Sequence, residues 1–322
     1  MKRAAPILAA ACALWIGAAD AAEVTVIGTP IDLDFGGAHR TTVGALTYRG
    51  GLKLVGNSAA FGGLSALRVS KDGMHVLAVT DRAAWFQMDL LYDTSGMLVG
   101  VEHGDLTPML DVDGKALVPP RSDAESLALV RGAALVGFER EHRVLRFALD
   151  ANGRPTAARP VIEPTPPAVA RAPTNQGLEA MTTLAEGRVF AISEGYLDDG
   201  AMLGWILGAG DRPAETVHYV AAPGFNPTDA TTLANGDVLV LERRFTIFDR
   251  AARIVRLRAA DIRDGARLIG EEIARLLPPM QVDNFEGIDA IAAPEGGTRV
   301  FLLSDDNFGA LQRTLLLQFW MP

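Results

Sequence analysis

Apolar positions along the chain gather in short runs that end at charged residues. Five such runs close on an acid: VLAVTDR (76–82), LVGFER (135–140), VFAISEG (189–195), VLVLER (238–243) and VFLLSDDN (300–307). Short apolar runs bounded by turn residues predict β-strands. The spacing between successive terminal acids is 58, 55, 48 and 63 residues, which indicates an internal repeat. These acids are Asp81, Glu139, Glu194, Glu242 and Asp305.

Each repeat opens with a small or acidic residue followed by apolar residues. The openings are GGLSAL (62–67), AESLAL (124–129), QGLEAM (176–181), PTDATTL (227–233) and FEGIDAI (285–291). A short turn, often with glycine, joins each opening to the run that ends in the acid. Strand, glycine turn and strand together predict a β-hairpin.

One or two further apolar runs follow each acid, for example WFQMDLLYD (85–93) and RVLRFALD (143–150). Four strands per repeat is the make-up of a propeller blade. The segment Val24–Leu54 has room for one more blade, and TLLLQFW (314–320) is a strand that could pair with it. We therefore predict an all-β chain with a single six-bladed β-propeller, closed by pairing of the N- and C-terminal strands. Five or seven blades remain open, because the first unit is degenerate.

Two segments fit the repeat less well. The proline-rich stretch 160–173 predicts a long loop between blades. In 266–279 the apolar residues have helical spacing, yet the blade lacks a strand without it. The sequence leaves helix or strand open here, and we favour an outer strand.

The first 22 residues resemble an export signal. Lys2 and Arg3 precede an apolar stretch, and Ala19-Asp20-Ala21 is an A-x-A cleavage pattern. Sixteen alanine-rich residues are short for a spanning helix, so a membrane anchor is the lesser alternative. We expect a signal peptide at 1–22, a propeller domain at 23–322, and a periplasmic or secreted protein with no transmembrane segment after cleavage.

Removal of the signal changes charge and cysteine content in informative ways. It takes away Cys12, the single cysteine, which excludes a thiol nucleophile and any disulfide. It leaves 28 basic and 38 acidic residues, a formal net charge of −10. Such a chain repels nucleic acid, so we expect no nucleic-acid partner.

Two sets of acids point to a candidate site. The innermost strands of all blades line one channel, so a residue type that recurs once per blade forms a ring at the channel mouth. One ring comes from the terminal acids. The other comes from the opening motifs and contains Glu125, Glu179, Asp229, Glu286 and Asp289.

Crowded carboxylates need a counter-charge, which a hard cation such as Ca²⁺ supplies through oxygen ligands. We predict a Ca²⁺ site whose ligands come from Glu125, Glu179, Asp229, Glu286 and Asp305. A bound ion could polarise a phosphoryl or carbonyl oxygen or activate a water. The predicted catalytic residues are Glu125, Glu179 and Glu286.

Arginines follow three of the terminal acids. Arg82, Arg140 and Arg243 could bind a phosphate or carboxylate of the substrate through forked hydrogen bonds. Alternatively they link acids of adjacent blades, and the terminal acids are then structural.

Other site chemistries lack their motifs. The chain has no G-x-S-x-G elbow, no zinc-spaced histidine pair and no glycine-rich phosphate loop that leads into a helix. We expect no nucleotide or organic cofactor. His103 and His142 are candidates for a general base at the mouth, although isolated histidines are usually surface residues.

The ordered pieces SDAESLAL, NQGLEAM, NPTDATTL, NFEGIDAI and SDDN…QRTLLLQF resemble the family described as esterase-like activity of phytase, over about residues 44–319. The resemblance implies an exported bacterial β-propeller, related in architecture to calcium-dependent phytases.

We expect a metal-assisted hydrolase of phosphoesters or carboxylic esters that acts as a monomer on a small anionic or ester substrate. A non-catalytic propeller that binds a ligand or an envelope partner is the alternative, because fold does not fix function. A lactonase-like hydrolase of sugar acids is a further alternative.

Overall fold

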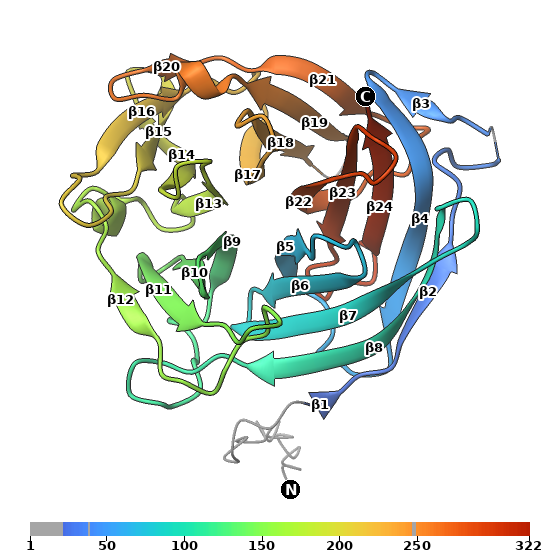
Figure 1. The fold of residues 1–322 in the computed structure, drawn as a ribbon, viewed down its shortest axis with the longest axis horizontal. Helices are drawn as coiled ribbons and strands as arrows, with labels where there is room; N and C mark the ends of the chain where they lie inside the picture. The colour runs from blue at the N-terminus through green and yellow to red at the C-terminus, as the bar shows by residue number, and fades with distance from the viewer. Residues whose placement is uncertain (1–21, 38, 247–248) are drawn as a thin grey trace, which may run out of the picture.

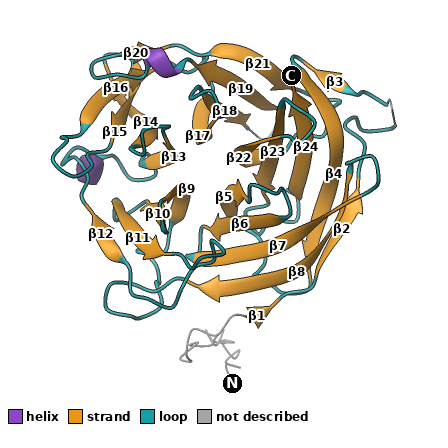
Figure 2. Ribbon diagram, in the orientation of Figure 1, coloured by secondary structure: helices purple, strands orange, loops and turns teal. Residues whose placement is uncertain are grey.

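The strands form five sheets arranged as blades around a central axis (Figures 1 and 2). The structure is a computed structural model that describes residues 22–322 except 38, 247 and 248. Residues 1–21, which carry nearly all of the predicted export signal and Cys12, lie outside the described part.

The first three blades follow one another along the chain, each with its innermost strand first. Blade 1 has β5 (Leu64–Val69), β6 (His75–Thr80), β7 (Ala84–Tyr92), β8 (Leu98–Pro108) and β1 (Ala22–Glu23). Blade 2 has β9 (Ala124–Val130), β10 (Ala133–Phe138), β11 (Arg143–Ala148) and β12 (Val161–Glu163). Blade 3 has β13 (Leu178–Thr183), β14 (Val189–Asp198), β15 (Ala201–Ile206), β16 (Glu215–Tyr219) and β20 (Arg267–Leu268).

Blades 4 and 5 complete the ring. Blade 4 has β17 (Asn226–Thr232), β18 (Val238–Phe245), β19 (Arg250–Leu257) and β21 (Glu271–Leu276). Blade 5 has β22 (Asn284–Ala292), β23 (Thr298–Asp305), β24 (Thr314–Met321), β4 (Leu46–Gly56) and β2 (Val26–Pro30), with β3 (Thr42–Val43) beside β4. The described helices are the short η1 (Val169–Arg171) and η2 (Ala259–Asp261), and neither has the length or hydropathy to cross a membrane.

The expected count of six blades is wrong, because the segment Val24–Leu54 does not form a blade of its own. Its long strand β4 hydrogen-bonds β24 instead, with Thr314 opposite Leu54 and Leu316 opposite Leu52. The fifth repeat supplies three strands and the N-terminal segment adds β4 and β2 outside them (Figure 1). Two incomplete units therefore make one sheet.

The ambiguous segment 266–279 is extended, with β20 and β21. β21 pairs with β19, and Ala274 and Leu276 are buried against the blade, while Ile269 is 73% exposed. A helix would have put Ile269 and Ile273 on one apolar face. Tertiary pairing has overridden helix propensity here.

Every innermost strand carries one extra residue near its start, a β-bulge. In each blade the register to the second strand skips one position, and the skipped residues are Ser65, Glu125, Glu179, Thr228 and Glu286. A bulge breaks the alternation of side chains and redirects the inserted residue. Five bulges at one level therefore aim five side chains at one end of the channel.

Arg68 of β5 fills the channel axis below this level. Its guanidinium donates to backbone carbonyls from all five blades and to both oxygens of Asp229, at 2.9 and 3.0 Å. Each of these carbonyls belongs to the residue two positions after the bulge residue of its strand. They are the carbonyls of Leu67, Leu127, Met181, Ala230 and Ile288. The inner strands have no sheet neighbour on the axis side, so one buried side chain satisfies five edge carbonyls.

Candidate functional site

Both predicted sets of acids lie at the same channel mouth. The innermost strand of a blade begins where the antiparallel second strand ends, so opening-motif and terminal acids meet at one end. We use "the mouth" for the cluster of Asp81, Glu125, Glu139, Glu179, Glu194, Arg243, Glu286 and Asp305. Seven carboxylates thus surround one guanidinium, and many of them influence each other's pKa.

The three glutamates predicted as catalytic are all bulge residues. Glu125, Glu179 and Glu286 lie near the starts of β9, β13 and β22, and Glu179 and Glu286 are only 7% and 9% exposed. The structure therefore brings these three together, from blades 2, 3 and 5. Blade 1 places Ser65 at the equivalent position and blade 4 places Thr228 there.

Blade 4 departs from the sequence repeat by one residue. Its bulge is at Thr228, so Asp229 faces Arg68 on the axis and does not join the mouth. Glu242 lies opposite Pro227, one residue before the position that the terminal acids have in the other blades. Its side chain is buried, where it accepts a hydrogen bond from the Tyr219 hydroxyl at 2.6 Å and pairs with Arg253. A shift of one residue moves a strand side chain to the other face.

Arg243 takes the position that a terminal acid has in the other blades. It lies opposite Asn226, as Asp305 lies opposite Asn284. Its guanidinium pairs with Glu286 and, at 2.9 Å, with Glu194. The arginine of blade 4 thus links acids of blades 5 and 3, and the mouth is neutralised on that side.

The opposite side of the mouth has a surplus of negative charge. Asp81, Glu125, Glu139 and Glu179 lie there, together with Asp123, which precedes β9. Oδ1 of Asp81 is buried without a hydrogen-bond partner. A buried acceptor without a partner is costly and marks a place where an incoming donor or cation gains most.

Burial raises the pKa of six carboxyls of the mouth. It raises the pKa of Asp81 to about 6, of Glu139 and Asp305 to about 7 and of Glu286 to about 8. Neighbouring carboxylates add to the effect, while Arg243 opposes it at Glu286. The pKa values of Glu125 and Glu179 are raised further by burial and by the other acids.

Glu139 connects two blades at the mouth. Its Oε1 accepts the N–H of Gly177, which precedes β13 of blade 3, at 2.5 Å. A Cβ on Gly177 would lie 2.5 Å from Nδ1 of His142, which explains glycine at this contact.

The two candidate histidines lie at opposite ends of the molecule. His142 is beside the mouth: its Nε2 is 3.1 Å from the Pro173 carbonyl and its Nδ1 is buried without a partner. His103 is on β8 and lines a groove with residues 69–72, which follow the far end of β5. His103 as a base at the mouth is therefore wrong.

The other two predicted arginines are at the rim. Arg82 is exposed and stacks over Phe308, with its guanidinium carbon 3.3 Å from the ring centroid. Arg140 is exposed and pairs with Asp123 at 2.5 Å. Both stand beside the acidic side of the mouth, where a substrate would enter.

The donor chemistry of the mouth fits a hard cation, since it offers carboxylate oxygens and the amide of Asn284. Among the residues that the structure describes, no three histidine, cysteine or carboxylate side chains already surround a point at metal distance. An ion would thus have to draw the carboxylates inward by rotamer changes.

The comparisons agree with this architecture. A family model described as Phytase-like, esterase-like activity of phytase, matches residues 59–308. The chain belongs to this family. No curated protein matches the chain.

Similar solved structures are distant in sequence. A provisionally assigned gluconolactonase is 12% identical, with 91% of this chain and 92% of that chain covered and a TM-score of 0.46. A PQQ-bound aldose sugar dehydrogenase from Streptomyces coelicolor is 11% identical, with 91% and 98% covered and a TM-score of 0.44. Glutaminyl cyclase from Myxococcus xanthus is 12% identical, with 81% and 92% covered and a TM-score of 0.38. Likenesses this weak carry no argument about activity.

Reasoning from the sequence missed two acids of the site, Asp123 and Asp306, which add charge to the mouth. The doublet Asp305-Asp306 and the pair Asp123-Glu125 were visible in the sequence. Of the two roles that the sequence left open for Arg243, the structure has the link between acids of adjacent blades. The register that places Arg243 there is fixed only by the pairing of β17 and β18.

Proposed function

We propose that this member of the phytase-like family is a cation-assisted hydrolase of a small phosphoester or carboxylic ester. The observation that carries the proposal is the convergence of seven buried or half-buried carboxylates on one mouth with a single guanidinium among them. Such a cluster is stabilised either by protons or by a multivalent cation.

Ca²⁺ is the ion we propose, with ligands drawn from Glu125, Glu179, Glu286 and Asp305. We leave Asp229 out of this set because its carboxylate is bound to Arg68. A bound ion of this kind would act as a Lewis acid toward a phosphoryl or carbonyl oxygen.

The chain's own residues supply binding and orientation. Arg82 and Arg140 at the rim can donate forked hydrogen bonds to an anionic group of the substrate. Arg243 and Asn284 hold Glu286 in one orientation. Glu139 and Glu179, whose pKa values are raised by burial, can exchange a proton with a water or leaving group held between them.

We further propose that the protein works outside the cytoplasm as a monomer. The basic residues, apolar stretch and A-x-A pattern at 1–22 support export.

The test uses purified protein with generic phosphomonoester and short-acyl ester substrates, in Ca²⁺ and in chelator. Hydrolysis that requires the ion, with a Ca²⁺-dependent rise in Tm, supports the proposal, because a ligand that binds only the native state must stabilise it. Absence of turnover in all conditions, or turnover unaffected by chelator, contradicts it.

A non-catalytic binding propeller is the second candidate, and Arg243 is the observation that favours it. An arginine that occupies one side of the mouth can replace part of a cation's charge. A Tm that does not change with Ca²⁺, together with no hydrolysis of any substrate, would favour this candidate. A sugar lactone belongs among the substrates, to test the lactonase-like alternative.

A further inference from the structure

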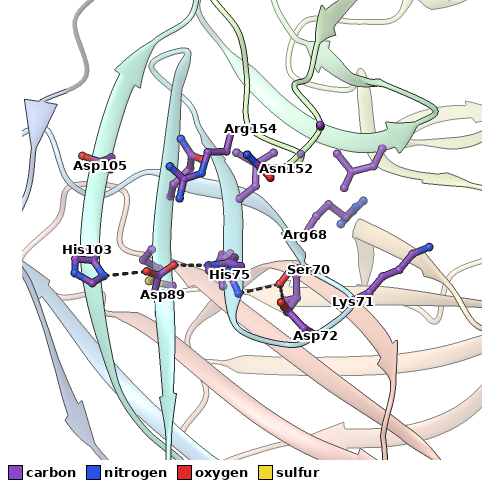
Figure 3. A pocket seen from close by; sticks show the side chains of 18 residues that line it. Arg68, Ser70, Lys71, Asp72, His75, Asp89, His103, Asp105, Asn152 and Arg154 are labelled. Atoms are coloured by element: carbon purple, nitrogen blue, oxygen red, sulfur yellow. Dashed lines mark hydrogen bonds and ion pairs between the residues drawn. The ribbon is translucent and has the colours of Figure 1, made fainter.

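A groove of about 830 Å³ lies between blades 1 and 2, at the end of the propeller opposite the mouth (Figure 3). Its floor is formed by β6, β7 and β8 and by the turn after β5. A second turn, Asn152–Arg154 of blade 2, lies over it. The groove shares no residue with the mouth, so any ligand it binds is separate from the proposed substrate.

Two histidines share one carboxylate on the floor of this groove. His75 Nδ1 is 2.5 Å from Oδ1 of Asp89, and His103 Nδ1 is 2.9 Å from Oδ2. The three residues lie side by side on adjacent strands (Figure 3). Because Asp89 fixes both rings through Nδ1, the Nε2 atom of each ring is left to meet a ligand or water.

The backbone is bent to bring His103 into this row. β8 has one residue more than β7 between the pairs Gln87–Asp105 and Asp89–Glu102, and His103 within this bulge has a φ of 52°. A non-glycine residue in the left-handed region costs on the order of 1 kcal/mol. Bulges and strained residues of this kind concentrate at binding and catalytic sites.

Two cations face the same space. Lys71 and Arg154 line the groove and are exposed, and neither forms an ion pair among the residues that the structure describes. The acids around them are mostly engaged. Asp72 accepts the Ser70 hydroxyl and the Met74 N–H, and Asp89 holds both histidines.

We propose that this groove is a second binding site, which takes a small oxyanion with two or more negative charges. Arg154 and the two imidazoles would contact its oxygens, and Lys71, farther along the groove, would add positive charge. Phosphate groups and multivalent carboxylates share this chemistry. Asn152 and Asp105 are placed to meet hydroxyl groups of a larger ligand.

Binding should strengthen as the histidines gain protons, because protonated rings present two more donors. Asp89 holds the pKa of His103 above its usual value. The charged and titratable groups that face the two rings are Arg68, Lys71, Asp72, Asp89, Glu102, Asp105 and Arg154.

The test follows the histidine ring signals by ¹H–¹³C NMR during titration with inorganic phosphate, and separately with citrate, at pH 6 and pH 8. Divalent ions are removed beforehand with a chelator, which is then dialysed away because it is itself a multivalent carboxylate, so that no divalent ion in the mouth captures the anion. Spectra of His75→Gln and His103→Asn assign the two rings, and asparagine suits the left-handed backbone at 103.

We expect the His75 and His103 signals to move saturably, with a Kd about tenfold weaker at pH 8 and about tenfold weaker in Arg154→Gln. Arg258→Gln, an exposed arginine of blade 4, is the matched control and should bind as the unmodified protein does. A response to only one of the two anions identifies the ligand as phosphate or carboxylate. Unmoved His75 and His103 signals, a response confined to His142, or equal affinity in Arg154→Gln would overturn the proposal.

Discussion

Arg243 on β18 pairs with Glu286 at the bulge of β22, so a residue of blade 4 neutralises the innermost acid of blade 5. The same guanidinium also holds Glu194 of blade 3. One arginine thus connects three blades at the mouth.

Arg243→Met should destabilise the cation-free protein by about 3 kcal/mol, because Glu194 and Glu286 would lose their partner in a largely buried site. Urea unfolding in chelator measures the change. Added Ca²⁺ should recover part of the loss, since the ion replaces the missing charge.

Arg256→Met is the matched control for this variant. Arg256 pairs with the exposed Glu271 on the surface of blade 4, and such pairs contribute about 0–1 kcal/mol. Equal destabilisation of the two variants would show that Arg243 is not the central counter-charge.

The stability of the cation-free protein should fall as the pH rises from about 5 to about 8. Burial raises the pKa of Asp81, Glu139, Asp305 and Glu286 to between about 6 and about 8, above the values of an unfolded chain. The folded state therefore binds more protons, and the stability present below about pH 4 is lost as each group ionises.

The measurement is the free energy of unfolding in chelator at intervals of pH. We expect a total loss on the order of a few kcal/mol. The double variant Glu139→Gln/Asp305→Asn should flatten the slope, and saturating Ca²⁺ should flatten it too. A stability that rises over this range would contradict the placement of these acids in a desolvated cluster.

The position of the bulge decides which acids affect cation binding. Glu125→Gln and Glu179→Gln should each reduce the Ca²⁺-induced rise in Tm by more than half. Asp229→Asn should leave that rise unchanged, because Asp229 is bound to Arg68 and not to the cation. The same variant should lower the Tm itself, because Arg68 loses its carboxylate partner. Differential scanning fluorimetry with and without Ca²⁺ separates the two effects. A loss of the Ca²⁺ response in Asp229→Asn would refute the register described for blade 4.

Arg68→Met should be among the most damaging single changes to the fold. It would leave Asp229 and five inner-strand carbonyls without their donor, at a cost of about 4 kcal/mol or more. Arg131→Met, at an exposed turn of blade 2, should change stability by less than about 0.5 kcal/mol. Chemical unfolding compares them, and similar midpoints would show that Arg68 does not hold the blades together.

The repeat pattern predicted much of this molecule because each blade carries its own alternation and turn. The strands, the propeller class and the gathering of Glu125, Glu179 and Glu286 all follow from local sequence. The number of blades did not, since it depends on β4 pairing with β24, about 260 residues away in the chain.

The misassigned residues of blade 4 have a similar cause. Asp229 and Glu242 stand in the sequence where Glu179 and Glu194 stand in blade 3, but the bulge at Thr228 shifts the register by one residue. The sequence shows Arg68 as an unusual charged residue within the apolar run LSALRV (64–69). It could not predict the role of Arg68, because the five carbonyls that this residue binds come from five strands far apart in the chain.

Arg68 also closes the central channel at one end, so that the channel opens only at the mouth. A molecule that enters at the mouth reaches a floor of guanidinium and carbonyl groups and has to leave by the same opening. Substrate would then enter and product leave through the same opening, which is lined by Arg82 and Arg140. An anionic product that dissociates slowly would therefore block binding of the next substrate. The groove on the far side would be reached only from the outside, and its ligand could influence the mouth through the blades but never by diffusion along the axis.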